Sequence, residues 1–424
     1  MRTGSASTHE RLLALFERNA RSARAAGVFG LRIEDQVLDG GYVTIRGQRL
    51  VNFGSCAYLA LNTDRRLKDG AIAAIERFGP VFSSSTGYTS VDLYTHLEQG
   101  LRQIYDSHVL VPTTTTLGHL AALPALVGED DLVLVDTQAH STVHLATQIL
   151  MAEGITVTPI GHNDMDALAS QALERAQHYR HVWYLADSVY SMFGDVAPVP
   201  RIMELVDSIP NMYAYFDDAH GFGWRGKHGR GVVLDLTPWH ERLVVAASLA
   251  KSFGSGGAVL AFGDQRLAER VQLSGGTMIF SGPIHPAELG AAVASCAIHL
   301  SDELVDRQEA MAKQIDFVRR AAVDADIPLA NASTTPIWFV KIGGTTQALQ
   351  VARRMMDRGF FLNYAAFPAV PAGQSGLRFT HTLYHSEHQI VSMIDALQDA
   401  CRAVTGDTEI VIDLTDRTAP KASG

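Results

Sequence analysis

Short apolar runs recur through the middle of the chain, with longer mixed stretches between them. They lie at 108–111, 132–136, 155–160, 182–187, 212–218, 243–248 and 258–263. Runs that are apolar throughout, instead of alternating, are typical of strands buried on both faces, and the stretches between them have the length of helices. The pattern predicts an α/β domain over about 51–285, with a mostly parallel sheet between layers of helices.

The two flanks of this region have different patterns. Residues 1–50 contain an amphipathic basic stretch and then GGYVTIRGQRLVNF, which runs just past residue 50, so we expect a helical arm and a hairpin. Residues 286–405 begin with a long helical pattern and continue through PIWFVKIG and SGLRFTHTL, which favours a smaller α+β domain. We expect the last residues, 406–424, to form a loosely held tail.

Charge and composition narrow the class of protein. The chain has 424 residues and a formal net charge of −10, and no Lys/Arg run is interleaved with aromatics, which argues against nucleic acid as a partner. Its three cysteines are widely spaced, as expected in a reducing compartment. No apolar stretch has the length of a signal-peptide core or a membrane span. We therefore expect a cytoplasmic protein.

Polar side chains follow several of the apolar runs. Asp187, Asp217, His220 and Lys251 each end a run or stand just after one. The carboxyl ends of parallel strands meet at one edge of a sheet, where ligands bind. An amine and a carboxylate there are what pyridoxal 5′-phosphate (PLP) needs, one for a Schiff base and one for its pyridine nitrogen. The hydroxyl-rich PTTTTLGHL at 112–120 enters a helix, whose N-terminus favours a phosphate.

Each of these signals also has a plainer interpretation. Lys251 could be an exposed residue closing a strand, Asp217 a turn former, His140 a core histidine and the Thr run a helix cap. The sequence GFGWRG fits a dinucleotide motif, but it continues as KHGRG and does not enter a helix. His140 and His144 have the spacing of zinc ligands, yet no Glu stands between them in the zinc-protease manner, so we predict no metal site.

Three longer blocks carry a family resemblance. DSVYSMFGDVAPVP, DDAHGFGWRGKHGRG and SLAKSFGSGGAVLAF resemble the α-oxoamine synthases, PLP-dependent enzymes of fold type I. The resemblance extends from NFGSCAYLAL to LRFTHTLYHS, which is most of the chain. It implies a homodimer with its active site at the subunit interface. It also implies a decarboxylative condensation of an amino acid with an acyl thioester.

The resemblance implies a role for each site residue. Lys251 would hold PLP and transfer protons, Asp217 would bind its pyridine nitrogen, and His140 would stack on its ring and polarise the thioester carbonyl. Arg378 would hold the carboxylate of the amino acid. The remaining cofactor contacts would come from Thr115 and Thr116 at the phosphate, Ser191 near the cofactor, His220 at the phenolic oxygen and Ser248 at the phosphate.

The chain departs from the family pattern on the substrate side. Cys56 stands where the family has an asparagine that contacts the carboxylate of the amino acid. The 83–96 region lacks an expected arginine and glycine, Pro283 replaces a phosphate-binding hydroxyl of the partner subunit, and Gly376 replaces an arginine. These departures predict a specialised biosynthetic branch that takes an acyl-CoA or an acyl carrier protein thioester.

Two alternatives stay open from the sequence. An aldolase, racemase or aminotransferase of the same fold would use the same lysine and aspartate. A non-catalytic partner subunit would keep the fold, although such subunits lack the lysine that this chain has at Lys251.

Overall fold

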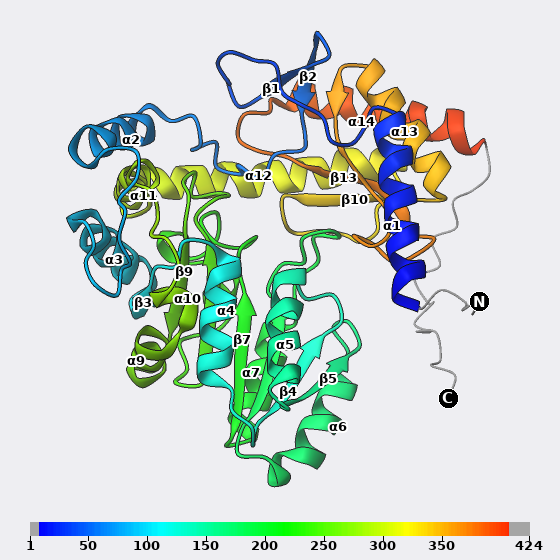
Figure 1. Ribbon diagram of the computed structural model, residues 1–424. Coiled ribbons are helices and arrows are strands. Elements are labelled where there is room, and N and C mark those ends of the chain that lie inside the picture. The colour runs from blue at the N-terminus through cyan, green and yellow to red at the C-terminus, as the bar shows by residue number, and fades with distance from the viewer. Residues whose placement is uncertain (1–7, 407–424) are drawn as a thin grey trace, which may run out of the picture.

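A seven-stranded sheet forms the centre of the molecule in the computed structural model, which describes residues 8–406 (Figure 1). The strand order is β3-β9-β8-β7-β6-β4-β5. β9 runs antiparallel to both of its neighbours, and the other pairs are parallel. The predicted mostly parallel sheet is therefore confirmed. Its strands are β3 (His108–Leu110), β4 (Leu132–Asp136), β5 (Thr156–Ile160), β6 (Val182–Asp187), β7 (Met212–Asp217), β8 (Leu243–Ser248) and β9 (Ala258–Phe262).

Helices cover both faces of this sheet. Leu132 and Leu134 of β4 belong to one apolar core, whereas Val133 and Val135 belong to another on the opposite face. This alternation is the physical reason that the strands read as unbroken apolar runs. The first core is closed by α3 (Asp92–Tyr105), α6 (Met165–Arg175), α7 (Val199–Ser208) and α11 (Pro286–His299), and the second by α4 (Thr115–Leu126), α5 (Ser141–Ala152) and α9 (Gln265–Ser274).

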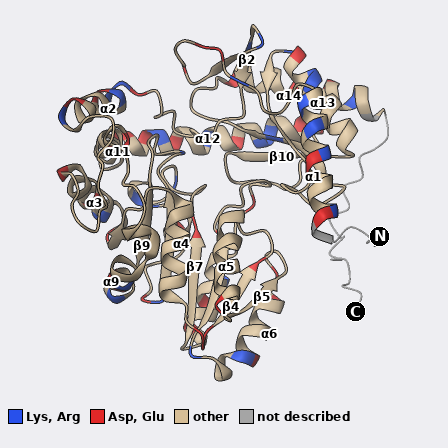
Figure 2. Cartoon of the chain, viewed as in Figure 1, with Lys and Arg blue, Asp and Glu red and all other residues tan. Residues whose placement is uncertain are grey.

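The helices differ in their charge. Neither α4 nor α5 contains a Lys, Arg, Asp or Glu, and Figure 2 shows both in tan. The C-terminal helices α12 (Glu303–Asp324), α13 (Thr345–Asp357) and α14 (Glu387–Thr405) carry both signs of charge along their length. The uncharged helices are those whose N-termini open toward the cavity described below.

Two small sheets and the C-terminal helices form the rest of the described chain. β10 (Ile337–Gly343), β12 (Asn363–Ala365) and β13 (Ser375–Thr380) make one antiparallel sheet. The predicted hairpin, β1 (Tyr42–Ile45) and β2 (Gln48–Asn52), pairs with β11 (Phe360–Phe361). The hairpin therefore shares a sheet with the C-terminal part of the chain. The predicted helical arm corresponds to α1 (Thr8–Ala25), and the predicted tail lies, beyond Gly406, outside the described residues.

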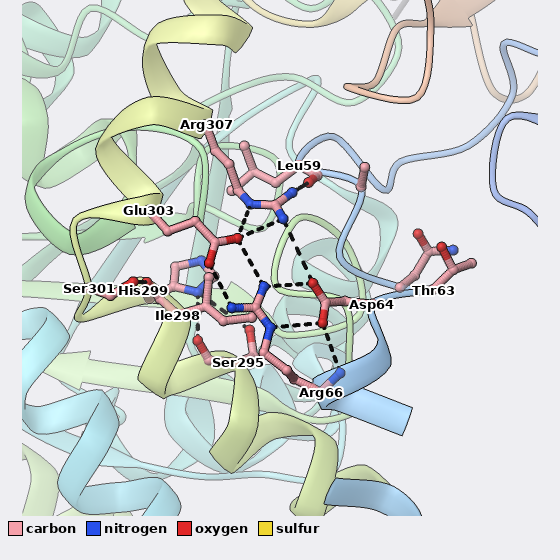
Figure 3. Close-up of polar contacts among 12 residues, drawn as sticks. Leu59, Thr63, Asp64, Arg66, Ser295, Ile298, His299, Ser301, Glu303 and Arg307 are labelled. Carbon is pink, nitrogen blue, oxygen red and sulfur yellow. Dashed lines mark hydrogen bonds and ion pairs between the residues drawn. The ribbon is translucent and has the colours of Figure 1, made fainter. Parts of the chain in front are cut away.

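An ion-pair network ties the segment after β2 to α12 (Figure 3). Glu303 bonds Arg66 at 2.6 Å and Arg307 at 2.7 Å, and Asp64 bonds Arg66 at 2.7 Å. Arg307 also donates to the carbonyl oxygen of Leu59 at 2.7 Å. The network therefore holds this connecting segment, which also contains Cys56 and Tyr58, against α12.

In residues 8–406, no helix is both long enough and apolar enough to cross a bilayer.

Candidate active site

A cavity of about 420 Å³ opens at the carboxyl ends of β6, β7 and β8. This is the edge at which ligands bind in open α/β sheets. We refer to it as the main cavity. Its wall brings together seven of the predicted site residues: Thr115, Thr116, His140, Asp217, His220, Ser248 and Lys251.

Lys251 stands on a closed loop between β8 and β9. The N–H of Leu249 donates to Gly257 O at 3.0 Å, and the N–H of Gly254 donates to Lys251 O at 3.0 Å. Gly254 has a φ of +78°, and a Cβ there would come within 2.9 Å of the Leu61 backbone. Glycine is therefore required at this turn. The glycine cluster after the lysine lets the chain return at once as the paired strand β9.

The pKa of Lys251 lies below its ordinary value. Burial is the main cause and the charge of Arg378 adds to it, against the opposing charges of Asp217, Cys56 and Asp187. Lowering the pKa raises the unprotonated fraction of the amine, which is the nucleophilic form.

Asp217 is held ionised by a buried partner that the sequence analysis missed. His119 Nε2 lies 3.0 Å from Asp217 Oδ2, and His119 Nδ1 lies 2.8 Å from the Tyr215 hydroxyl. Since a carboxylate only accepts, His119 Nε2 carries the hydrogen. Burial acts to raise the pKa of Asp217, but the hydrogen bond and charge of His119, followed by the charge of Lys251, bring it down to about 2.

His119 could have been found from the sequence by its surroundings. It is a polar residue within the apolar run LGHLAAL of α4, and its side chain is fully buried. A buried polar side chain needs a hydrogen-bond partner, and the strand-end carboxylates were the available acceptors.

The next acid along the chain, Asp218, has a different function. Its Oδ1 accepts from the Ser188 hydroxyl and its Oδ2 from the N–H of Val233 at 3.2 Å. A Cβ on Gly221 or Gly231 would lie 2.0 Å from one of its oxygens. Burial is the main cause that raises the pKa of Asp218 to about 7. The glycine-rich motif at 221–226 therefore wraps around a buried carboxyl group.

His140 precedes α5 and caps it. Its ring Nδ1 accepts from the backbone N–H of Thr142 at 3.3 Å and lies 2.7 Å from the Thr142 hydroxyl. The backbone N–H of His140 donates to Asp187 Oδ1 at 2.8 Å. Because Nδ1 accepts, the hydrogen of the neutral ring is on Nε2. Burial is the main cause that lowers the pKa of His140. The ring is thus a neutral hydrogen-bond donor at physiological pH.

Arg378, Cys56 and Ser191 do not line the main cavity. They lie beside it, with Tyr58, in a group that we call the Arg378 cluster. Arg378 Nε donates to Ser191 O at 2.6 Å, and Arg378 Nη2 lies 3.6 Å from Cys56 Sγ. The Tyr58 hydroxyl lies 2.8 Å from Nδ1 of His220, which does line the cavity.

A second cavity, of about 460 Å³, adjoins the main one at His140. Ser191 lies in its wall, next to Met192 and Phe193 and opposite the apolar segment 367–371. We refer to it as the adjoining cavity. Because its wall is largely apolar and it meets the main cavity at His140, it has room for an apolar ligand group that extends away from the main cavity.

A histidine that the sequence analysis did not select fixes the loop carrying Ser191. His162 Nδ1 lies 3.1 Å from Asp136 Oδ1, and its Nε2 lies 2.7 Å from Asp195 Oδ2. Burial disfavours the charged ring, but the hydrogen bonds to the two carboxylates outweigh it and raise the pKa of His162 to about 9. A charged imidazolium therefore joins the end of β4 to this loop.

Three of the four departures from the family pattern lie at two places, and the fourth, Cys56, lies in the Arg378 cluster. Segments 81–88 and 279–285, which include Pro283, surround a third cavity of about 480 Å³, and His285 lines both this cavity and the main one. Gly376 lies in β13, where a Cβ would come within 2.1 Å of Val340 O. No side chain fits on this backbone, so glycine is required at the position where the family pattern has an arginine.

The main cavity contains the kinds of group that PLP needs. Lys251 is an amine that could take the aldehyde, and Asp217 is an ionised carboxylate that could pair with a protonated ring nitrogen. Thr115 and Thr116 open α4, whose first N–H groups are not used within the helix. Within residues 8–406 no group of three or more His, Cys, Asp or Glu side chains is placed to hold a metal ion.

Known proteins match most of the chain. Residues 48–397 match the model of a family described as Aminotransferase class I and II. An 8-amino-7-oxononanoate synthase from Maricaulis maris is 31% identical over 369 residues, 86% of this chain and 90% of the relative. A serine palmitoyltransferase from Bacteriovorax stolpii is 27% identical over 361 residues, 84% of each chain. A solved serine palmitoyltransferase from Sphingomonas wittichii has a TM-score of 0.85 at 22% identity, over 94% of this chain and 99% of that one, so the fold is shared.

Proposed function

Because the chain belongs to the α-oxoamine synthases, PLP-dependent enzymes of fold type I, we propose that it condenses a small amino acid with an acyl thioester. In this reaction the amino acid loses its carboxylate as CO₂, a bond forms between its α-carbon and the acyl carbon, and the carbon–sulfur bond breaks to release a thiolate. The product is an α-amino ketone. The observation that carries the proposal is that Lys251 and Asp217 share the main cavity, while Arg378 lies beside it and an apolar cavity adjoins it.

Lys251 and Asp217 are the proposed residues for the cofactor. The chemistry that PLP supplies when bound is an electron-accepting ring conjugated to the α-carbon of the amino acid. Lys251 holds the cofactor and, once released, removes and returns the proton at the α-carbon. Asp217 stays ionised through its bond to His119 and so keeps the ring nitrogen protonated. Ser248, Thr115 and Thr116 hold the phosphate.

His140 and Arg378 are the proposed residues for the two substrates. His140 lines both cavities, and its Nε2–H can donate to the thioester carbonyl oxygen as negative charge develops there. Arg378 binds the carboxylate of the amino acid, with its Nε already fixed by Ser191 O. The acyl chain occupies the adjoining cavity, beside Met192 and Phe193.

We also propose that the active unit is a homodimer. Tyr88 and Phe280 are 90% and 86% exposed, and both stand at the third cavity beside His285. Large apolar side chains so exposed next to a site are typical of a surface that a second chain covers. Sedimentation analysis of the purified protein tests this, with Phe280→Asp expected to shift the population toward monomer; a wild-type protein that sediments as a monomer would contradict it.

The reaction is tested by supplying amino acids together with an acyl-CoA or an acyl carrier protein thioester. Formation of CO₂, free thiol and α-amino ketone in equal amounts, from one pair of substrates, is the expected result. An aldolase, racemase or aminotransferase would change the amino acid without consuming thioester. That outcome would replace the proposed reaction but keep the proposed cofactor.

A further inference from the structure

The three cysteines of the chain lie in different environments. Cys296 and Cys401 are 4% and 5% exposed, each within an apolar core. Burial raises the pKa of Cys296 to about 12 and that of Cys401 to about 11. Cys56 is partly exposed and faces charged groups. A thiolate is therefore disfavoured at the first two positions and favoured at the third.

The position of Cys56 is defined by Arg378. The arginine is only 6% exposed, its Nε donates to Ser191 O at 2.6 Å, and its Nη2 lies 3.6 Å from Cys56 Sγ. A buried guanidinium needs a negative partner. On this side of the arginine, the group within hydrogen-bond distance is the sulfur of Cys56.

The other groups that face Cys56 act in the same direction. Burial raises the pKa of the thiol, but the charges of Arg378 and Lys251 and the hydrogen bonds from Arg378 and Tyr58 outweigh it, and the pKa is lowered. Tyr58 is itself bonded to His220, whose pKa is held well below its ordinary value mainly by burial, so that histidine adds no charge.

We infer that in the resting enzyme Cys56 is a thiolate paired with the guanidinium of Arg378, and that the carboxylate of the amino acid must displace it. This inference rests on the proposed function, because it assigns the substrate carboxylate to Arg378. One guanidinium cannot fully satisfy two anions in a partly buried site. The displaced sulfur therefore takes up a proton, and amino-acid binding consumes one proton that an amide side chain at this position would not consume.

This competition makes amino-acid affinity depend on pH. Above the pKa of Cys56, each pH unit raises the apparent KM for the amino acid about tenfold, because the thiolate must be protonated before the carboxylate binds. It also makes Cys56 the reactive cysteine of the described chain, since the thiolate is the nucleophilic form of the side chain.

Alkylation of the PLP-loaded protein with iodoacetamide, followed by peptide mass spectrometry across pH 5–10, tests the resting state. Cys56 is expected to react with a midpoint below the value of about 8.5 for a free thiol. Cys296 and Cys401 serve as internal controls and stay unmodified. Alanine or glycine, supplied with the reagent, slows labelling of Cys56. Equal labelling of the three cysteines, or a Cys56 midpoint at the free-thiol value, would overturn the inference.

Two variants distinguish an effect of the Arg378 charge on Cys56 labelling from an effect of the exposure of Cys56. Arg378→Gln removes the charge and should move the Cys56 midpoint upward by one pH unit or more. Arg378→Lys keeps a charge and a folded site, so its midpoint should stay nearer to that of the parent. If both variants label with the parent midpoint, Arg378 does not stabilise the thiolate.

Turnover kinetics test the competition itself. In the parent, the amino-acid KM rises with pH, while in Cys56→Ser it loses this rise because the hydroxyl does not ionise in the same range. If condensation occurs and the Cys56→Ser profile follows that of the parent, the inference fails and the proposed function stands. If no thioester is consumed by any pair of substrates while the alkylation results hold, the proposed function fails and the thiolate–arginine pair stands.

Discussion

The main cavity and the Arg378 cluster lie side by side but are built in different ways. Asp217, Ser248 and Lys251 come from the ends of neighbouring strands of one sheet, so their relative positions follow from the strand pairing. Cys56 and Arg378 are 322 residues apart in sequence and belong to loops and a small sheet. The chemistry proposed for this chain lies where the large sheet fixes the geometry. Its departures from the family pattern lie outside that sheet, in loops and in β13.

The largest effect is expected at Lys251. Lys251→Ala removes the proposed amine of the main cavity, so activity should fall at least about 10³-fold and the visible absorbance of the bound cofactor should disappear. Absorption spectra and turnover measure this. Far-ultraviolet circular dichroism should match the parent, because the loop is held by backbone bonds. Retained absorbance in the variant would mean that another amine holds the cofactor.

Asp217 and Asp218 offer a matched pair of adjacent residues. Asp217→Asn should lower kcat/KM about 10²-fold or more, since the ring nitrogen loses its anionic partner. Asp218→Asn should instead lower the free energy of unfolding by about 1–3 kcal/mol, because both of its oxygens accept hydrogen bonds and an amide accepts at one. Kinetics and urea unfolding of both variants measure the contrast. The reverse pattern would show that the wrong acid is assigned to the cofactor.

His119 tests whether the main cavity depends on buried support. His119→Leu removes the bond that keeps the pKa of Asp217 at about 2, so that pKa rises and the acid limb of the activity profile moves to higher pH. Activity at neutral pH should fall about tenfold, and dialysis should remove the cofactor faster. Tyr215→Phe, which loses only the outer hydrogen bond, should change activity a few-fold. A parent-like acid limb in His119→Leu would exclude this positioning role.

His162 gives the smallest effect on turnover and a clear effect on stability. Its pKa of about 9 lies above its ordinary value of 6.5, so its contribution is full below pH 6.5 and is lost as pH rises through 9. The free energy of unfolding should therefore fall by about 3 kcal/mol over this window. Urea unfolding at fixed protein concentration measures it. His162→Gln should flatten the decrease; an equally steep decrease in the variant would assign it to other groups.

The fold was largely predictable because most strands of its large sheet are buried on both faces. Each apolar run reports a strand without reference to any distant residue, and strand order in α/β sheets brings their ends together. Asp217, Ser248 and Lys251 therefore met as the sequence indicated. Their roles stay predictions, since a cavity wall shows position and not chemistry.

The sequence could not predict the contacts between residues that lie far apart along the chain. His119 contacts an acid 98 residues away, and His162 joins the end of β4 to the loop that carries Ser191. The pairing of the N-terminal hairpin with β11 is likewise a long-range contact. No local periodicity reports such contacts. Arg378 was selected through the family resemblance alone, and its contact with Cys56 emerged only in the structure.

The loop that carries Lys251 has a consequence for stereochemistry. Because Leu249, Gly254 and Gly257 close this loop through backbone bonds, the main chain at the lysine is fixed while its amine swings on the side chain alone. The amine therefore reaches the main cavity from one side. If Lys251 is the base, as proposed, it removes and restores hydrogen on one face of the α-carbon. The proposed reaction would then distinguish the two hydrogens of a glycine methylene group and release a single enantiomer when the amino acid is larger.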